Sequence, residues 1–234
     1  MAFNDLLKLD LPADFPAHDY SDFMAAARAV LLPNKTEAWK EFAGASNLIG
    51  WRFRSSFEDM RTYIASWQKY GANVSFEEIY LRERALFGMF SSGVSCVESI
   101  CYALYALASH PSVLGLVFGD PEQRRCNPLQ LRNALGSHSS AKALVSDLTA
   151  LTNSNEWSLW VDLRNRMTHR SNLPRIIYGA IGSTPPPAKA LQFAATSSTP
   201  AFEADESHLK ALFLWLSKSL GQLLKGGRHL ASGP

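Results

Sequence analysis

Residues 162–170 read DLRNRMTHR and bring Arg164, Asn165 and His169 close together in the chain. Histidine accepts and releases a proton near neutral pH, and arginine offers a permanent cation with two parallel donors for phosphate oxygens. These residue types suit phosphoryl chemistry that needs no metal. The six histidines and three cysteines lack metal-ligand spacing, and no glycine-rich phosphate loop competes with this segment. We therefore predict neither a metal nor a cofactor.

The spacing of this motif raises a geometric problem if the segment is a regular helix. Five helical residues place Arg164 and His169 about 140° apart around the axis. The polar side of the helix holds Asp162, Asn165, Arg166 and His169. Arg164 instead shares the apolar side with Trp157, Trp160, Leu163 and Met167. Its charge needs a partner, because burial of an unpaired cation is costly.

Three arrangements of the motif remain open. The helix frays near His169, or Arg164 and His169 act together across a dimer interface. In the third arrangement Arg164 is structural and pairs with a carboxylate such as Glu98, which lies at the margin of the apolar side of an earlier helix.

The elements that must position the motif are predicted to be almost all helical, from apolar residues at helical spacing and from capping signals. The expected helices span 21–32, 35–43, 46–70, 75–109, 128–135, 139–152, 155–170 and 203–225. Residues 171–202 contain two short extended segments around a proline-rich loop, which indicates a small hairpin or flap. We divide the chain into a helical extension at 1–72 and a bundle at 73–230, with a flexible Pro/Ser/Thr-rich segment at 182–200.

The long helix at 75–109 carries a wide apolar arc and, opposite it, a stripe of small residues. The stripe holds Gly88, Ser92, Ser95, Ser99, Ala103 and Ala106. Small side chains let another helix approach closely, so the stripe indicates either packing inside the bundle or a dimer seam. Residues 85–108 are long and apolar enough to span a bilayer, but Glu98 and four serines favour a buried central helix and no membrane.

The Arg-x4-His pattern, with a polar residue directly after Arg164 and a long apolar helix before it, resembles the HEPN superfamily over roughly residues 75–225. The resemblance implies an all-α bundle acting as a metal-independent endoribonuclease, in which a homodimer forms one composite site. His169 would then be the acid/base group, Arg164 the phosphate clamp, and Asn165 an orienting group, with Asp162 and Glu98 in support. Some relatives carry a tyrosine two residues after the histidine; here Ser171 stands there, which argues against control by nucleotidylation of that position.

Several basic residues could guide RNA to such a site. Arg166, Arg170 and Arg175 flank the motif and are the predicted RNA-binding residues. Arg52 and Arg54 alternate with Trp51 and Phe53, which fits either phosphate contact with base stacking or a simple amphipathic helix.

Composition restricts the remaining choices. The 234 residues are 47% hydrophobic and carry a net charge of +2, which excludes a disordered chain or a strongly basic polycation. The odd number of cysteines and the absence of a signal-like N-terminus favour a cytoplasmic protein. We expect RNA, a second copy and a protein inhibitor as partners, in stress or defence. The alternatives are a non-catalytic HEPN-like module that binds RNA or protein, and a bundle that binds a ligand near Trp157 and Trp160.

Overall fold

The computed structural model describes residues 1–33, 36–72, 74–169, 175–176, 192–193 and 201–233, and for His169 and the strands at 175–176 and 192–193 it describes the backbone alone. The described chain is mostly helical and packs as a bundle, which confirms the predicted all-α architecture. Its elements in order are β1 (Ala2–Asn4), β2 (Leu9–Leu11), α1 (Ala17–Leu31), α2 (Glu37–Tyr70), α3 (Phe76–Ser109), α4 (Asp120–Arg125), α5 (Pro128–Leu135), a 3₁₀ turn (Ser139–Ala141), α6 (Lys142–Thr152), α7 (Asn155–His169), β3 (Arg175–Ile176), β4 (Gln192–Phe193), β5 (Phe202–Glu203) and α8 (Glu206–Ser232).

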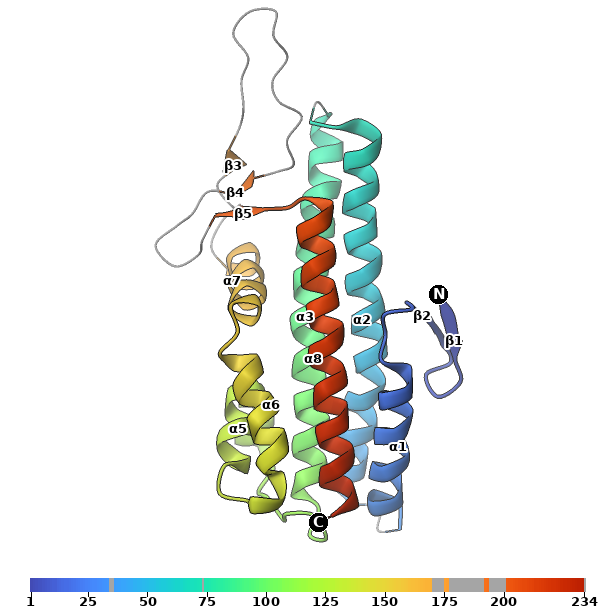
Figure 1. Cartoon of the computed structure of the whole chain (residues 1–234), viewed down its shortest axis with the longest axis vertical. Coiled ribbons are helices and arrows are strands. Elements are labelled where there is room, and N and C mark those ends of the chain that lie inside the picture. Colours follow the sequence, from blue (N-terminus) through green and yellow to red (C-terminus); the bar gives the residue numbers. More distant parts are fainter. Residues whose placement is uncertain (34–35, 73, 170–174, 177–191, 194–200, 234) are drawn as a thin grey trace, which may run out of the picture.

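Helices α2 and α3 form a long antiparallel hairpin, and α8 runs along it to complete the centre of the bundle (Figure 1). Helix α1 packs against α8 on one side, while α5, α6 and α7 lie on the other side of α3. Residues 1–72, predicted as an extension, thus contribute α2, which packs along α3. A short hairpin, β1–β2, precedes the helices, and β3, β4 and β5 pair antiparallel within the region predicted to hold extended segments.

Helix α3 is the central helix of the bundle. Within the described residues it is the one helix long and apolar enough to cross a membrane, and just over half of that apolar window is buried inside the bundle. Of its small residues, Ser92, Ala103 and Ala106 are buried, and a Cβ added to Gly88 would overlap Asp59 of α2. The small-residue stripe therefore serves packing within one chain at these positions.

Several helix boundaries differ from the predicted ones. Helix α1 begins at Ala17 instead of 21, and α8 begins at Glu206 instead of 203. At two other places a predicted helix end lies inside a helix, because glycine does not break a helix that packing supports. Residues 35–43 and 46–70 were expected to be separate helices, but α2 runs unbroken through Gly44, and the hydroxyl of Ser46 donates to the Phe42 carbonyl at 2.7 Å instead of capping a new helix. Helix α8 continues past the predicted end at 225 through Gly226 and Gly227. The short helix α4 and the β1–β2 hairpin were not predicted.

These glycines give a stability prediction with a built-in control. A Cβ at Gly227 would overlap Leu104 and Phe23, whereas a Cβ at Gly44 would meet nothing within 4 Å. Gly227→Ala is therefore expected to cost about 1–3 kcal/mol through overpacking. Gly44→Ala should instead stabilise the helix by about 0.5–1 kcal/mol. Urea unfolding of both variants measures the difference, and equal effects would contradict the packing role of Gly227.

Candidate functional site

The motif lies on α7, which is held against the middle of α3. The Ser154 hydroxyl caps the start of α7 by accepting the backbone N–H of Trp157 at 3.1 Å. Further along the helix, Trp160 is buried beneath α3, where its ring meets Phe90 edge-on at 4.9 Å between centroids, and a Cβ at Gly93 would overlap it. Glycine at position 93 thus permits the close approach of the two helices. The Trp160 ring fills core space. It therefore does not line a pocket, as it would in the alternative of a ligand-binding bundle.

Arg164 makes an ion pair with Glu98 of α3. Its Nη2 lies 3.3 Å from Glu98 Oε1, and the two side chains are 27% and 35% exposed. Burial raises the pKa of Glu98, and the nearby Arg164 charge lowers it in part. Arg164 Nε is buried without a hydrogen-bond acceptor among the described contacts, so the pair is formed through one nitrogen and is not a bidentate fork. This is the carboxylate partner that the third arrangement required.

Asp162 and Arg166 form a second ion pair, along α7 itself. Arg166 Nε lies 3.4 Å from Asp162 Oδ2, and the Arg166 side chain is only 12% exposed. The polar side of the helix is therefore largely covered here. Arg166 is a predicted RNA-binding residue, and in this structure its guanidinium pairs with Asp162.

The remaining motif residues are placed less fully. Asn165 is half-buried on α7. His169 is the last residue of α7. Arg164 and His169 are therefore about 140° apart around the helix axis, as regular helical geometry requires. Among the predicted RNA-binding residues, Arg170 lies outside the described residues, and Arg175 is described only as backbone in β3. The segment 182–200, predicted to be flexible, also lies outside them apart from β4.

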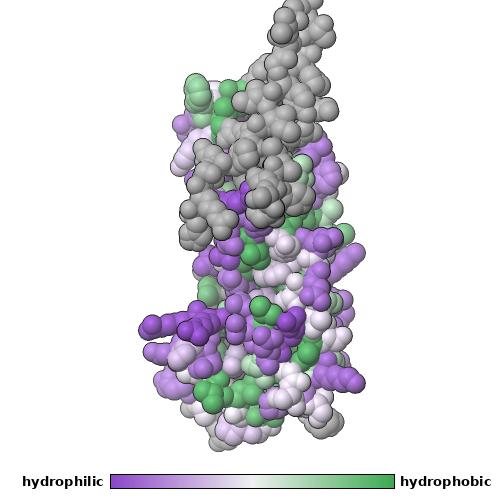
Figure 2. Space-filling view, turned by 90° about the vertical axis from the view of Figure 1, so that its left-hand side faces the viewer, coloured by the Kyte–Doolittle hydropathy of each residue, from purple (hydrophilic) through white to green (hydrophobic). Residues whose placement is uncertain are grey.

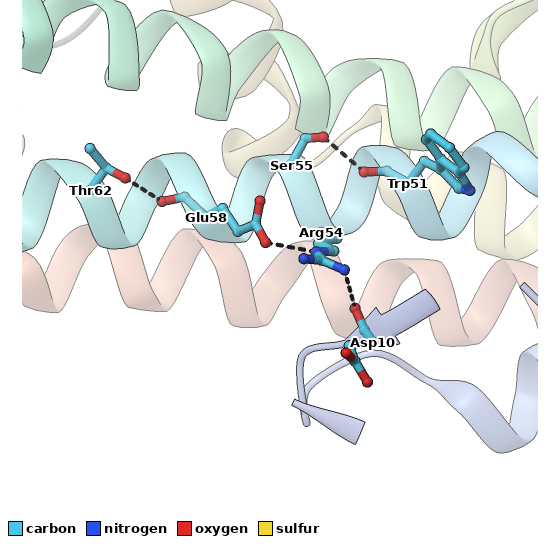
Figure 3. Close-up of polar contacts among 6 residues, drawn as sticks. All are labelled: Asp10, Trp51, Arg54, Ser55, Glu58 and Thr62. Carbon is cyan, nitrogen blue, oxygen red and sulfur yellow. Dashed lines mark hydrogen bonds and ion pairs between the residues drawn. The ribbon is translucent and has the colours of Figure 1, made fainter. Parts of the chain in front are cut away.

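Among the other basic positions, Arg54 and Arg82 are held by contacts within the protein. Arg54 donates to Glu58 at 2.6 Å and to the Asp10 carbonyl at 3.2 Å, and Figure 3 shows these contacts on the outer side of α2. Phe53 is buried, whereas Trp51 and Arg52 remain exposed. The pattern around residue 53 is therefore an amphipathic helix, with Trp51 and Arg52 on its solvent side.

Arg82 is also held inside the protein. It is buried, donates to the Ser66 carbonyl and to the Gly71 carbonyl at 2.9 and 2.8 Å, and lies 4.3 Å from the centroid of the Trp67 ring. Burial lowers the pKa of Arg82. It therefore fixes the connection between α2 and α3 and is not presented to a ligand.

Cys126, in the connection between α4 and α5, lies near enough to Glu98 for the two groups to interact electrostatically. Burial, with a smaller contribution from the Glu98 charge, raises the pKa of its thiol to about 12. The amino-acid sequence alone does not indicate this raised pKa, because the proximity of Cys126 and Glu98 depends on how the α4–α5 connection packs on α3. No group of three or more histidine, cysteine or acidic side chains suitable for a metal ion occurs among the described residues.

The raised pKa of Cys126 predicts low reactivity. Thiolate is the reactive form, and at pH 8 a thiol of pKa about 12 has a thiolate fraction roughly 10³-fold smaller than an unperturbed one, so it should react more slowly. Titration of the folded protein with Ellman's reagent is expected to be slow, and unfolding in urea should make all three cysteines react quickly. Rapid reaction of Cys126 in the folded protein, identified by peptide mapping, would contradict this placement.

On the face that Figure 2 presents, hydrophilic and hydrophobic side chains are interspersed below the grey atoms. No family model, no curated protein and no solved structure matches the chain.

Proposed function

We propose that the protein is a HEPN-type, metal-independent endoribonuclease that acts as a homodimer. The observation that carries the proposal is the state of Arg164. This residue lies partly exposed on the motif helix and is held by Glu98 through a single nitrogen. A guanidinium has five N–H donors, so an arginine positioned in this way keeps donors for a phosphate. A digest of varied RNAs in excess EDTA tests the proposal.

The proposed reaction divides its tasks among few groups. His169 removes the proton from the ribose 2′-hydroxyl and returns one to the leaving 5′-oxygen. Arg164 stabilises the charge on the phosphorane, and Asn165 orients the phosphate. Glu98 acts as a positioning residue, because it fixes the guanidinium of Arg164. RNA would approach along Arg170 and Arg175, with Arg166 supporting the helix through Asp162.

Two protomers are needed because α7 carries Arg164 and His169 about 140° apart. A two-fold axis near the motif helices would let the arginine of one chain face the histidine of its partner. We place this dimer in the cytoplasm, in stress or defence, with a protein inhibitor as a further partner.

Light scattering at micromolar concentration is expected to give about twice the mass of one chain. The physical reason is the split motif, which leaves a single protomer with an incomplete site. A strictly monomeric mass would contradict the composite site. If the protein is a dimer but a short cross-linker attached at position 169 cannot join the two protomers, the dimer prediction stands and the composite site is contradicted.

The second candidate is a non-catalytic HEPN-like module that binds RNA or another protein. The Glu98–Arg164 ion pair is consistent with this candidate, because the contact gives Arg164 a structural role in joining α7 to α3 even without catalysis. RNA binding without cleavage under all conditions would support this candidate.

A further inference from the structure

A groove of about 800 Å³ lies between α2 and α8, apart from the motif helix. Its apolar lining comes from Met1 and from Phe57, Met60, Ile64 and Ala65 of α2. Figure 3 shows this stretch of α2 beside α8, with Glu58 and Thr62 on α2. The Phe57 ring packs on Phe213 of α8 at 5.4 Å between centroids, which closes the floor. A volume of this size suits a small organic molecule.

Most charges around the groove are already neutralised by neighbours. Lys210 donates to Glu206 at 2.6 Å, and the Gln68 amide donates to the other oxygen of the same carboxylate at 2.8 Å. Glu58 accepts from Arg54 at 2.6 Å. Each acidic side chain of the lining is thereby paired with a cation, so neither offers a free negative charge to a ligand.

Arg61 is the exception. Its guanidinium carbon lies 5.7 Å from the centroid of the Phe57 ring, and no carboxylate contacts it among the described residues. The lining therefore combines an apolar floor with one positive charge that nothing in the described chain neutralises. Arginine binds carboxylates and sulfonates through two parallel hydrogen bonds, and Arg61 lies over the Phe57 ring, beside the apolar lining.

We propose that this groove binds a small amphipathic organic anion. Its single carboxylate or sulfonate would bind Arg61, and its aromatic or acyl body would lie on Phe57 and Ile64. Charge complementarity favours this occupant. A cationic ligand would be repelled by Arg61, and a ligand with several charges would lose hydration of those charges against the apolar lining. The proposal does not depend on ribonuclease activity, because the groove shares no residue with the Glu98–Arg164 pair.

A pair of fluorescent probes tests the proposal directly. The anionic probe is 1-anilinonaphthalene-8-sulfonate, and the neutral probe is N-phenyl-1-naphthylamine, which keeps the aromatic body and lacks the sulfonate. Arg61→Gln is expected to weaken the anionic probe at least fivefold and to leave the neutral probe within twofold. Ala65→Trp, an exposed position that needs no core rearrangement, should fill the groove and weaken both probes at least tenfold.

The matched control is Arg52→Gln, which removes an exposed arginine of α2 outside the groove lining. It should leave both affinities unchanged, and circular dichroism should show the same helix content in all variants. Unchanged anionic binding in Arg61→Gln, equal losses in Arg61→Gln and Arg52→Gln, or full binding of both probes by Ala65→Trp would each overturn the proposal.

Discussion

RNA incubated with the wild-type protein in excess EDTA is expected to be cleaved and to carry 2′,3′-cyclic phosphate ends. His169→Ala is expected to slow this cleavage by about 10²–10⁴-fold, the usual contribution of a general acid–base group. The cyclic end follows from attack by the neighbouring 2′-hydroxyl, which needs proton transfer and charge stabilisation but no activated water. Gel analysis of end-labelled RNA, followed by phosphatase treatment of the products, measures both the rate and the chemistry of the ends.

The controls for this digest separate the mechanism from contamination and from loss of folding. His18→Ala removes a highly exposed histidine of α1 and should leave the rate unchanged. DNA of the same sequence should remain uncut, because it lacks the 2′-hydroxyl. Cleavage that stops in EDTA and returns with a divalent metal would reject the mechanism. Absence of cleavage with every RNA would favour the non-catalytic module.

The sequence predicted best those features that depend on residues close together in the chain. Ser75 with Glu78 three residues later is a local capping signal for the helix expected from residue 75, and the Ser75 hydroxyl accepts the backbone N–H of Glu78 at 3.2 Å. Asn127 followed by Pro128 is a similar signal for the helix expected at 128–135, and the Asn127 side chain accepts the N–H of Gln130 at 3.0 Å. Caps are local because donor and acceptor lie within one turn.

The sequence failed where a distant contact outweighed a local signal. Gly226 and Gly227 indicate a helix end by local rules, but both residues lie in α8, where the missing side chains make room for Leu144 and Leu104. No local rule reveals this, because the neighbours come from α3 and α6. Glycine in a helix interior costs about 1 kcal/mol relative to alanine, and close packing of whole helices offsets that amount.

The same distinction applies to the candidate site. A helical wheel places Arg164 on the apolar side of its helix and Glu98 at the margin of the apolar arc on α3, so their pairing could be offered as one alternative from sequence. The wheel also places Arg166 on the polar side, but it does not show what covers that side. Arg166 is 12% exposed and paired to Asp162. A helical wheel alone does not distinguish such a covered residue from an exposed one.

Glu98 gives the candidate site a testable dependence on pH. Burial is the main cause of its raised pKa, so the folded protein binds this proton more tightly than the unfolded chain, whose carboxyl titrates near 4.5. The stability from this group is therefore complete below pH 4.5 and is lost as the pH rises through the raised value in the folded protein. Glu98→Gln should remove that part of the dependence, as measured by urea unfolding across this pH range.

Arg164→Lys is expected to lower cleavage about 100-fold or more while the fold is retained, because lysine keeps the charge but loses the two parallel donors. The stability cost should stay within about 1 kcal/mol, since the pair is partly exposed, formed through one nitrogen and screened by water. Glu98→Gln should lower the rate less, because it loosens the guanidinium without removing it. Kinetics and urea unfolding of the same variants provide the measurement.

A double-mutant cycle with Arg164→Gln, which removes the charge, and Glu98→Gln then decides between the two roles of the arginine. If Arg164 is a phosphate clamp, the coupling energy in unfolding should be about 1 kcal/mol or less, whereas the coupling in cleavage should be much larger. A purely structural arginine reverses this order: removal of either partner would cost about 3–5 kcal/mol of stability, as for a buried pair, and cleavage by the folded fraction would be intact. The 3.3 Å distance and the 27% exposure of Arg164 favour the first outcome, because a guanidinium that retains solvent contact and unused donors can still reach a phosphate.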